Sequence, residues 1–230
     1  MPDVILFDLF GVIARNQSQA AKRTLAETAD APVTAFWDAY WRLRAPYDLG
    51  QITGAEYWRW VATALGTTFD GDRVTALIAA DVASWSAVDD AMVALIERVN
   101  AAGTHLALLS NVPEELASHY EQHHARWLRH FDLIAFSCRI GRAKPDADAF
   151  LWCCRALGLA PDRLLFIDDR AENINAADRL GLHTHLFTDP AAAARAIDAT
   201  TAGRRSSRLA SPVPPLHQTD RRLSSWPVSE

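Results

Sequence analysis

The sequence has little cysteine and no long hydrophobic run, and both absences narrow the class of protein. Three cysteines (Cys138, Cys153 and Cys154) are too few for a disulfide framework, so we expect them to be reduced and partly buried. No apolar stretch approaches the ~18 residues of a membrane span, and no basic segment followed by an apolar one opens the chain. We therefore expect a cytoplasmic protein that does not act at a membrane.

Lysine is also scarce, and the charge is unevenly distributed. Of the 23 basic residues only Lys22 and Lys144 are lysines, and the formal net charge is −5. The segment 203–230 holds five arginines and two acidic residues, so the rest of the chain is more acidic than the total. An acidic body argues against nucleic acid as a partner.

Short apolar runs alternate with helical patterns from residue 88 onward. We expect strands at 4–7, 105–109, 133–136, 164–167 and 183–187, with helices between them and a last helix from Pro190 to about Thr200. This alternation predicts an α/β fold, a doubly wound parallel five-stranded (Rossmann-like) sheet.

The segment after the first strand reads differently, because all of it has helical periodicity. We expect helices at 17–29, at 33–44 with Pro46 at its end, from a Thr53–Glu56 capping box to Leu65, and from Asp70 to Ala83. Such a connection is far longer than an ordinary βα loop. We assign 15–84 to a small all-helical cap domain with a mostly buried set of tryptophans (Trp37, Trp41, Trp58, Trp60), 1–14 and 85–202 to the α/β core, and 203–230 to a disordered tail.

Polar residues follow the predicted strands at the point where each one ends. Asp8 ends the first strand and is followed by a turn at Gly11, Ser110-Asn111 ends the second, and Asp168-Asp169 ends the fourth. Lys144 lies between the third strand and its helix, which Asp146 begins. Because ligands of open α/β sheets bind at the carboxyl ends of the strands, we expect these groups to converge there.

The chemistry of this set favours a metal and a phosphoryl group. Carboxylates this close cannot all stay ionised in a dry site without a cation. Mg²⁺ suits oxygen ligands and leaves room for phosphate oxygens. A lysine and a serine beside it fit a phosphoryl group, and one carboxylate remains to attack it. The substrate would then be a small molecule.

Four segments, in order, carry a resemblance to a known family. They are Phe7-Asp8-Leu9-Phe10-Gly11-Val12, Leu109-Ser110-Asn111, Lys144-Pro145-Asp146, and Phe166-Ile167-Asp168-Asp169 with Asn173. Over about residues 3–187 the chain resembles the haloacid dehalogenase-like (HAD) hydrolase superfamily, with an all-helical cap inserted after the first strand.

The resemblance implies a role for each matched residue. Asp8 would be the nucleophile that forms a covalent aspartyl intermediate, and Lys144 would offset the charge around it. Ser110 and Asn111 would orient phosphoryl or leaving-group oxygens. The residues implied to hold Mg²⁺ are Asp8, the backbone carbonyl of Phe10, Asp168 and Asp169, with Asn173 supporting their loop.

One departure from the family pattern leaves the reaction open. Phosphatases of this superfamily usually have an acid–base aspartate two residues after the nucleophile, where this chain has Phe10. Dehalogenases have an aromatic residue there but lack the paired acids, whereas some sugar-phosphate phosphatases lack the second aspartate and keep the pair. The leading hypothesis is a Mg²⁺-dependent phosphatase of a small phosphorylated metabolite. The alternatives are a 2-haloacid dehalogenase-type hydrolase and a non-catalytic binding protein.

Structural explanations stand beside the functional ones. Asp8 could cap the turn at Gly11, and Asp168-Asp169 could cap the following helix. Arg15, Arg42 and Arg44 could grip a substrate carboxylate or phosphate in a bidentate manner, or lie on solvated surfaces.

Overall fold

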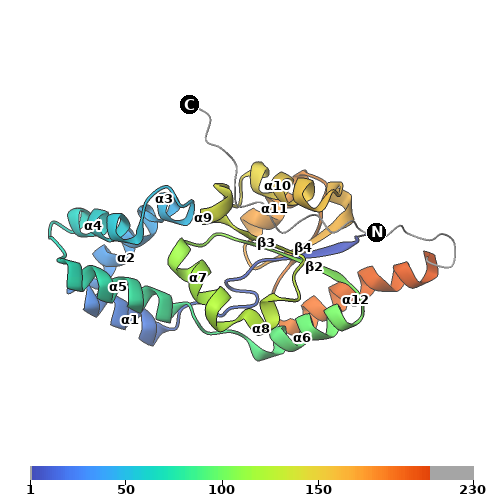
Figure 1. Cartoon of the computed structure of the whole chain (residues 1–230), viewed down its shortest axis with the longest axis horizontal. Helices are drawn as coiled ribbons and strands as arrows, with labels where there is room; N and C mark the ends of the chain where they lie inside the picture. Colours follow the sequence, from blue (N-terminus) through green and yellow to red (C-terminus); the bar gives the residue numbers. More distant parts are fainter. Residues whose placement is uncertain (1, 208–230) are drawn as a thin grey trace.

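The computed structural model describes residues 2–207, and for 201–207 only the backbone. Its centre is a sheet of five parallel strands in the order β3-β2-β1-β4-β5. The strands are β1 (Val4–Phe7), β2 (His105–Ser110), β3 (Leu133–Phe136), β4 (Leu164–Asp168) and β5 (His183–Leu186). The predicted α/β fold is confirmed, and β1 occupies the middle of the sheet (Figure 1).

Helices cover both faces of this sheet (Figure 1). Ile5 and Phe7 point to a core shared with α6 (Asp90–Ala101), α7 (Glu114–His123), α8 (Ala125–Leu128) and α12 (Pro190–Ser207). Val4 and Leu6 point to a second core with α10 (Ala147–Leu157) and α11 (Ala171–Arg179). Because both faces are covered, β1 is a continuous apolar run rather than an alternating one. The remaining short elements are α9 (Ser137–Ile140) and the 3₁₀ turn η1 (Pro161–Arg163).

A helical insertion lies between β1 and β2 and forms a lobe beside the sheet (Figure 1). Its helices are α1 (Gln19–Thr28), α2 (Val33–Arg42), α3 (Arg44–Asp48), α4 (Gly54–Ala64) and α5 (Gly71–Ser84). They enclose a core of their own around Phe36, Tyr40 and Trp58. The chain enters β1 from the opposite side, so the carboxyl end of β1 faces the insertion (Figure 1). The exact domain limits, 15–84 for the cap, remain a prediction.

Local sequence signals placed several helix starts correctly. The capping box is formed, with Thr53 Oγ1 accepting from the Glu56 N–H and the Glu56 carboxylate accepting from the Thr53 N–H. Asp70 caps α5 through the N–H of Arg73. Asp146 precedes α10 as expected, although its side chain makes no capping bond.

Two expectations for the insertion were wrong. Pro46 does not end a helix, because α2 stops at Arg42 and Pro46 lies in the first turn of α3, where its missing N–H costs nothing. Trp58 is buried, but Trp41 and Trp60 are 52% and 43% exposed. Helical periodicity predicts which residues share one face of a helix. It does not predict whether that face packs against a neighbouring element or lines a cavity.

The last helix is longer than expected. α12 continues to Ser207, past Gly203, where the disordered tail was predicted to begin. A single glycine costs a helix only ~1 kcal/mol relative to alanine, so it need not end the helix. The predicted tail from 208 to 230 lies outside the described residues. Within 2–207, no helix combines the length and apolar character needed to cross a membrane.

Candidate active site

One ammonium group holds two carboxylates together at the carboxyl end of the central strands. Lys144 Nζ lies 2.6 Å from Asp8 Oδ1 and 2.7 Å from Asp168 Oδ2. Asp8 directly follows β1, Asp168 ends β4, and all three side chains are buried. The adjacent pairing of β1 with β4 therefore brings together residues 160 positions apart, as the strand-end pattern predicted.

A third carboxylate, Asp169, completes an acidic cluster. Asp8, Asp168 and Asp169 each offer an oxygen within 4.8 Å of the other two. Among the described residues, Asp169 Oδ1 is buried without a hydrogen-bond partner, and Oδ2 accepts a long bond of 3.5 Å from Asn16 Nδ2. Three carboxylates against one ammonium leave the site short of positive charge. An oxygen-liganded divalent cation fits this deficit and the unpartnered oxygen.

The pKa shifts at the site reflect the same shortage of positive charge. Burial raises the pKa of Asp8 to about 8, with the Asp168 charge adding to burial and Lys144 opposing it. Burial and Asp168 also raise the pKa of Asp169. Burial alone would lower the pKa of Lys144, but Asp8 and Asp168 outweigh it and leave that pKa raised. The Lys144 side chain therefore stays protonated, whereas the three carboxylates need a further cation to remain ionised together.

Asp168 is held in place by donors from α11 and the turn before it. Asn173 Nδ2 donates to both Asp168 oxygens, at 3.0 and 2.9 Å, and the Arg170 N–H donates to Oδ1 at 2.8 Å. With Lys144 on Oδ2 as well, Asp168 is saturated. In this geometry Asp168 fixes the position of the Lys144 ammonium group.

Asn111 fixes the segment that carries Lys144. Its Nδ2 donates to the Lys144 carbonyl at 2.7 Å, and its Oδ1 accepts from the Lys144 N–H at 2.9 Å. Both ends of the amide thus bind the backbone of one residue, Lys144. The predicted contact of Asn111 with phosphoryl oxygens remains a prediction. Ser110, at the end of β2, is fully buried and its Oγ has no partner within the described residues.

The Phe10 side chain forms an apolar wall. Its ring meets Trp85 edge-on with centroids 5.0 Å apart, and Tyr120 at 5.7 Å. Trp85 follows α5, where the chain leaves the insertion. No proton donor or acceptor is offered by the side chain at this position.

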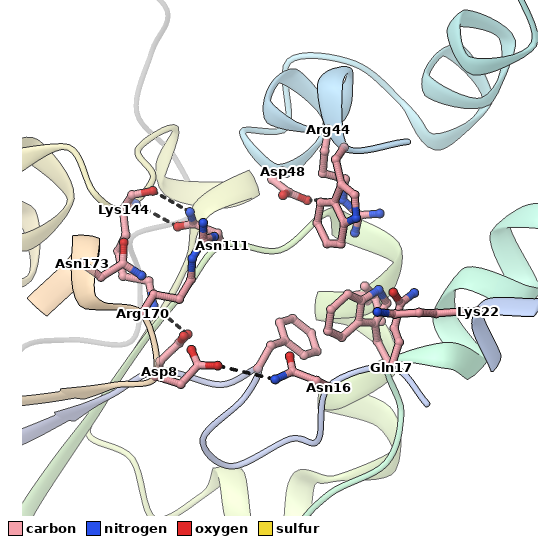
Figure 2. Close-up of a pocket in the computed structure, with 15 residues that line it drawn as sticks. Asp8, Asn16, Gln17, Lys22, Arg44, Asp48, Asn111, Lys144, Arg170 and Asn173 are labelled. Atoms are coloured by element: carbon pink, nitrogen blue, oxygen red, sulfur yellow. Dashed lines mark hydrogen bonds and ion pairs between the residues drawn. The ribbon is translucent and has the colours of Figure 1, made fainter. Parts of the chain in front are cut away.

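These groups open into a cavity of about 560 Å³ between the core and the insertion. One side of the cavity is formed by residues of the α/β core, among them Asp8, Asn111, Lys144 and Asn173 (Figure 2). The other side holds Gln17, Lys22 and Arg44 (Figure 2). The sequence-based reasoning missed several lining residues, namely Asn16, Gln17, Lys22, Trp41, Asp48, Trp85 and Arg170. For Lys22 a signal existed, since lysine is so rare in this chain.

The three candidate arginines have different positions. Arg44 is buried and lines the cavity, but Asp48 and Asp81 already accept from it at 2.7 and 2.8 Å. Arg15 is exposed, with Asp89 3.7 Å away, and Arg42 is exposed as well. Neither Arg15 nor Arg42 lines the cavity. The structure brings only Arg44 of this set to the site.

Comparison with known proteins identifies the class. The model of the haloacid dehalogenase-like hydrolases matches residues 2–181, and the chain belongs to this family of hydrolases. Bifunctional epoxide hydrolase 2 of Rattus norvegicus is 31% identical over 86 residues, 37% of this chain and 15% of that protein. Acyl-CoA dehydrogenase family member 10 of Mus musculus is 35% identical over 71 residues, 31% of this chain and 7% of that protein. The chain thus matches only a small part of these longer relatives.

Solved structures share the fold at low sequence identity. A HAD family enzyme from Bacteroides thetaiotaomicron, in complex with magnesium and inorganic phosphate, has a TM-score of 0.66 at 19% identity, covering 82% of this chain and 95% of that one. The L-2-haloacid dehalogenase of Xanthobacter autotrophicus, with chloropropionic acid covalently bound, has a TM-score of 0.62 at 15% identity, covering 87% and 84%. The same fold therefore carries both a phosphate complex and a dehalogenase.

Proposed function

We propose that the protein is a Mg²⁺-dependent phosphatase of small phosphorylated metabolites that works through an aspartyl-phosphate intermediate. The observation that carries the proposal is the acidic cluster, with three carboxylates within 4.8 Å, one ammonium, and a buried Asp169 oxygen without a partner. In a phosphatase, an excess of carboxylates binds the metal that neutralises the phosphoryl oxygens of the substrate. A dehalogenase does not need this excess, because its substrate has no phosphoryl oxygens.

Asp8 is the proposed nucleophile. The Leu9 N–H and Lys144 Nζ both bind its Oδ1, each at 2.6 Å, and so fix the orientation of the carboxylate. Asp8 attacks phosphorus, the bond to the leaving-group oxygen breaks, and that oxygen takes a proton from water. A water molecule then attacks phosphorus, inorganic phosphate leaves, and the Asp8 carboxylate is restored.

Asp8, Asp169 and the Phe10 carbonyl are the proposed ligands of Mg²⁺, with Asp168 in support. When bound, the ion supplies positive charge for the phosphoryl oxygens. Lys144 adds a second positive charge at the same place, and the rings of Phe10 and Trp85 form an apolar part of the cavity lining.

The second candidate is carbon–halogen hydrolysis through Asp8. It is favoured by Phe10, because a halide leaves without a proton, and by the fold shared with the L-2-haloacid dehalogenase. The candidate carboxylate grip, Arg44, is however already paired with Asp48 and Asp81. A third candidate, a binding protein without activity, predicts no turnover of either substrate class.

A substrate screen separates these functions. Phosphorylated metabolites and short 2-haloacids are assayed with Mg²⁺ and with chelator, for the wild type and Asp8→Asn. The proposal predicts phosphate release that needs both Mg²⁺ and Asp8. Halide release in chelator, or phosphate release that Asp8→Asn retains, would contradict it.

A further inference from the structure

Both lysines of the chain line the same cavity. Lys144 belongs to the core side, whereas Lys22 lies on α1 of the insertion. Lys22 reaches inward from the insertion, on the side of the cavity opposite Asp8 (Figure 2). The other 21 basic residues are arginines, so the two compact ammonium groups are concentrated at one place.

Lys22 differs from the other cations around the cavity, because it has no carboxylate partner among the described residues. The ion pairs of the others are Lys144 with Asp8 and Asp168, Arg44 with Asp48 and Asp81, and Arg170 with Glu172. Among the described side chains, those of residues 2–200, none forms a hydrogen bond or ion pair with the Lys22 ammonium. Its charge is therefore available to a ligand in the cavity.

Local stability does not account for a lysine at this position. Lys22 is the fourth residue of α1 counted from Gln19, close to the positive end of the helix dipole, and the first turn has no acidic residue. Its Nζ lies 5.9 Å from the centroid of the Trp37 ring, at the outer limit of a cation–π contact. The side chain is half-buried rather than extended into solvent.

We propose that Lys22 binds a second negatively charged group of the substrate, so that the substrates are small phosphomonoesters with a carboxylate or a second phosphate at the end away from Asp8. The inference rests on the proposed phosphatase function and adds the substrate class. Phe10, Trp41 and Trp85 line the same cavity and provide apolar surface for the carbon skeleton. A volume of about 560 Å³ suits a small metabolite.

Matched substrates test this proposal directly. 3-Phosphoglycerate is compared with glycerol 3-phosphate for the carboxylate, and fructose 1,6-bisphosphate with fructose 6-phosphate for the second phosphate. For the wild type we expect kcat/KM to favour the member with the extra anion by ~10- to 100-fold in at least one pair, the usual effect of a charged hydrogen bond. In Lys22→Met this ratio falls toward one, mainly through KM, and Lys22→Arg restores most of it.

Arg23→Met is the matched control, since it removes the same charge from an exposed neighbouring position on α1 and should keep the ratio. Equal kcat/KM within both pairs for the wild type, or equal losses for both members in Lys22→Met, would overturn the role of Lys22 and leave the phosphatase proposal standing.

Absence of turnover for all four esters would instead count against the proposed function. Calorimetric binding of the same pairs to Asp8→Asn then decides the role of Lys22. Tighter binding of the more anionic member, lost in the Asp8→Asn/Lys22→Met double variant, supports the role, and equal binding or none overturns it.

Discussion

Gly11 and Asp169 lie so close that no side chain fits between them. A Cβ placed on Gly11 would be 2.0 Å from Asp169 Oδ2, and Gly11 has a φ of +85°, a conformation that other residues rarely adopt. The turn after β1 thus brings backbone directly against the carboxylate proposed to bind the metal. This contact gives the glycine of the first motif a physical function at the site.

Gly11→Ala should therefore weaken metal binding in addition to straining the backbone. Displacement of Asp169 is expected to lower Mg²⁺ affinity by ~10- to 100-fold, as for other residues that orient a metal ligand. Gly181→Ala is the matched control, because Gly181 has a φ of +87° with nothing within 4 Å of the added Cβ. Both variants should lose stability, and Mg²⁺ titration should separate them. Equal Mg²⁺ affinities would contradict this account.

The Asn111 clamp on the Lys144 peptide is a second target. Asn111→Ala removes both hydrogen bonds, at 2.7 and 2.9 Å, and leaves two backbone groups without these partners. We expect a loss of ~1–3 kcal/mol of stability in denaturant unfolding and a fall in kcat, because Lys144 loses its fixed position. Asn111→Asp keeps the hydrogen bond from the Lys144 N–H, so its stability and kcat should lie between those of the wild type and of Asn111→Ala. A variant with unchanged kcat would show that the clamp does not position Lys144.

The absence of an acid at Phe10 predicts a strong dependence on the leaving group. A general acid is typically worth ~10²–10⁴ in rate, and the ring packed on Trp85 and Tyr120 supplies none. Across a series of substituted phenyl phosphates, kcat/KM should rise steeply as the pKa of the leaving phenol falls. A flat plot would mean that another side chain donates the proton.

The pairing of Arg44 predicts a structural rather than a substrate-binding effect for its partner. Asp81→Ala removes one of the two carboxylates that accept from the buried Arg44 and should cost ~1–3 kcal/mol of unfolding free energy. Arg15→Ala, which removes an exposed pair at 3.7 Å, should cost under ~1 kcal/mol. Thermal or denaturant unfolding measures both. Similar small effects would indicate that Arg44 is free to bind substrate.

Much of the fold and the centre of the site follow from local signals in the sequence. The buried run of β1, the Thr53 capping box and the acids at strand ends are all set within a few residues, and parallel strands then gather Asp8, Lys144 and Asp168 by topology. The insertion side of the site was not predictable in this way. Trp85 and Lys22 face the cavity because of how the insertion packs on the core.

The central claim is that Asp8 accepts a phosphoryl group in a magnesium-containing site. Beryllofluoride with Mg²⁺ mimics a phosphorylated aspartate, and a ligand that binds only the folded state raises Tm. The most direct measurement is the Tm shift with both additives for the wild type and for Asp8→Asn. The account predicts a rise for the wild type that requires Mg²⁺ and is lost in Asp8→Asn. No rise in the wild type, or the same rise in Asp8→Asn, would contradict it.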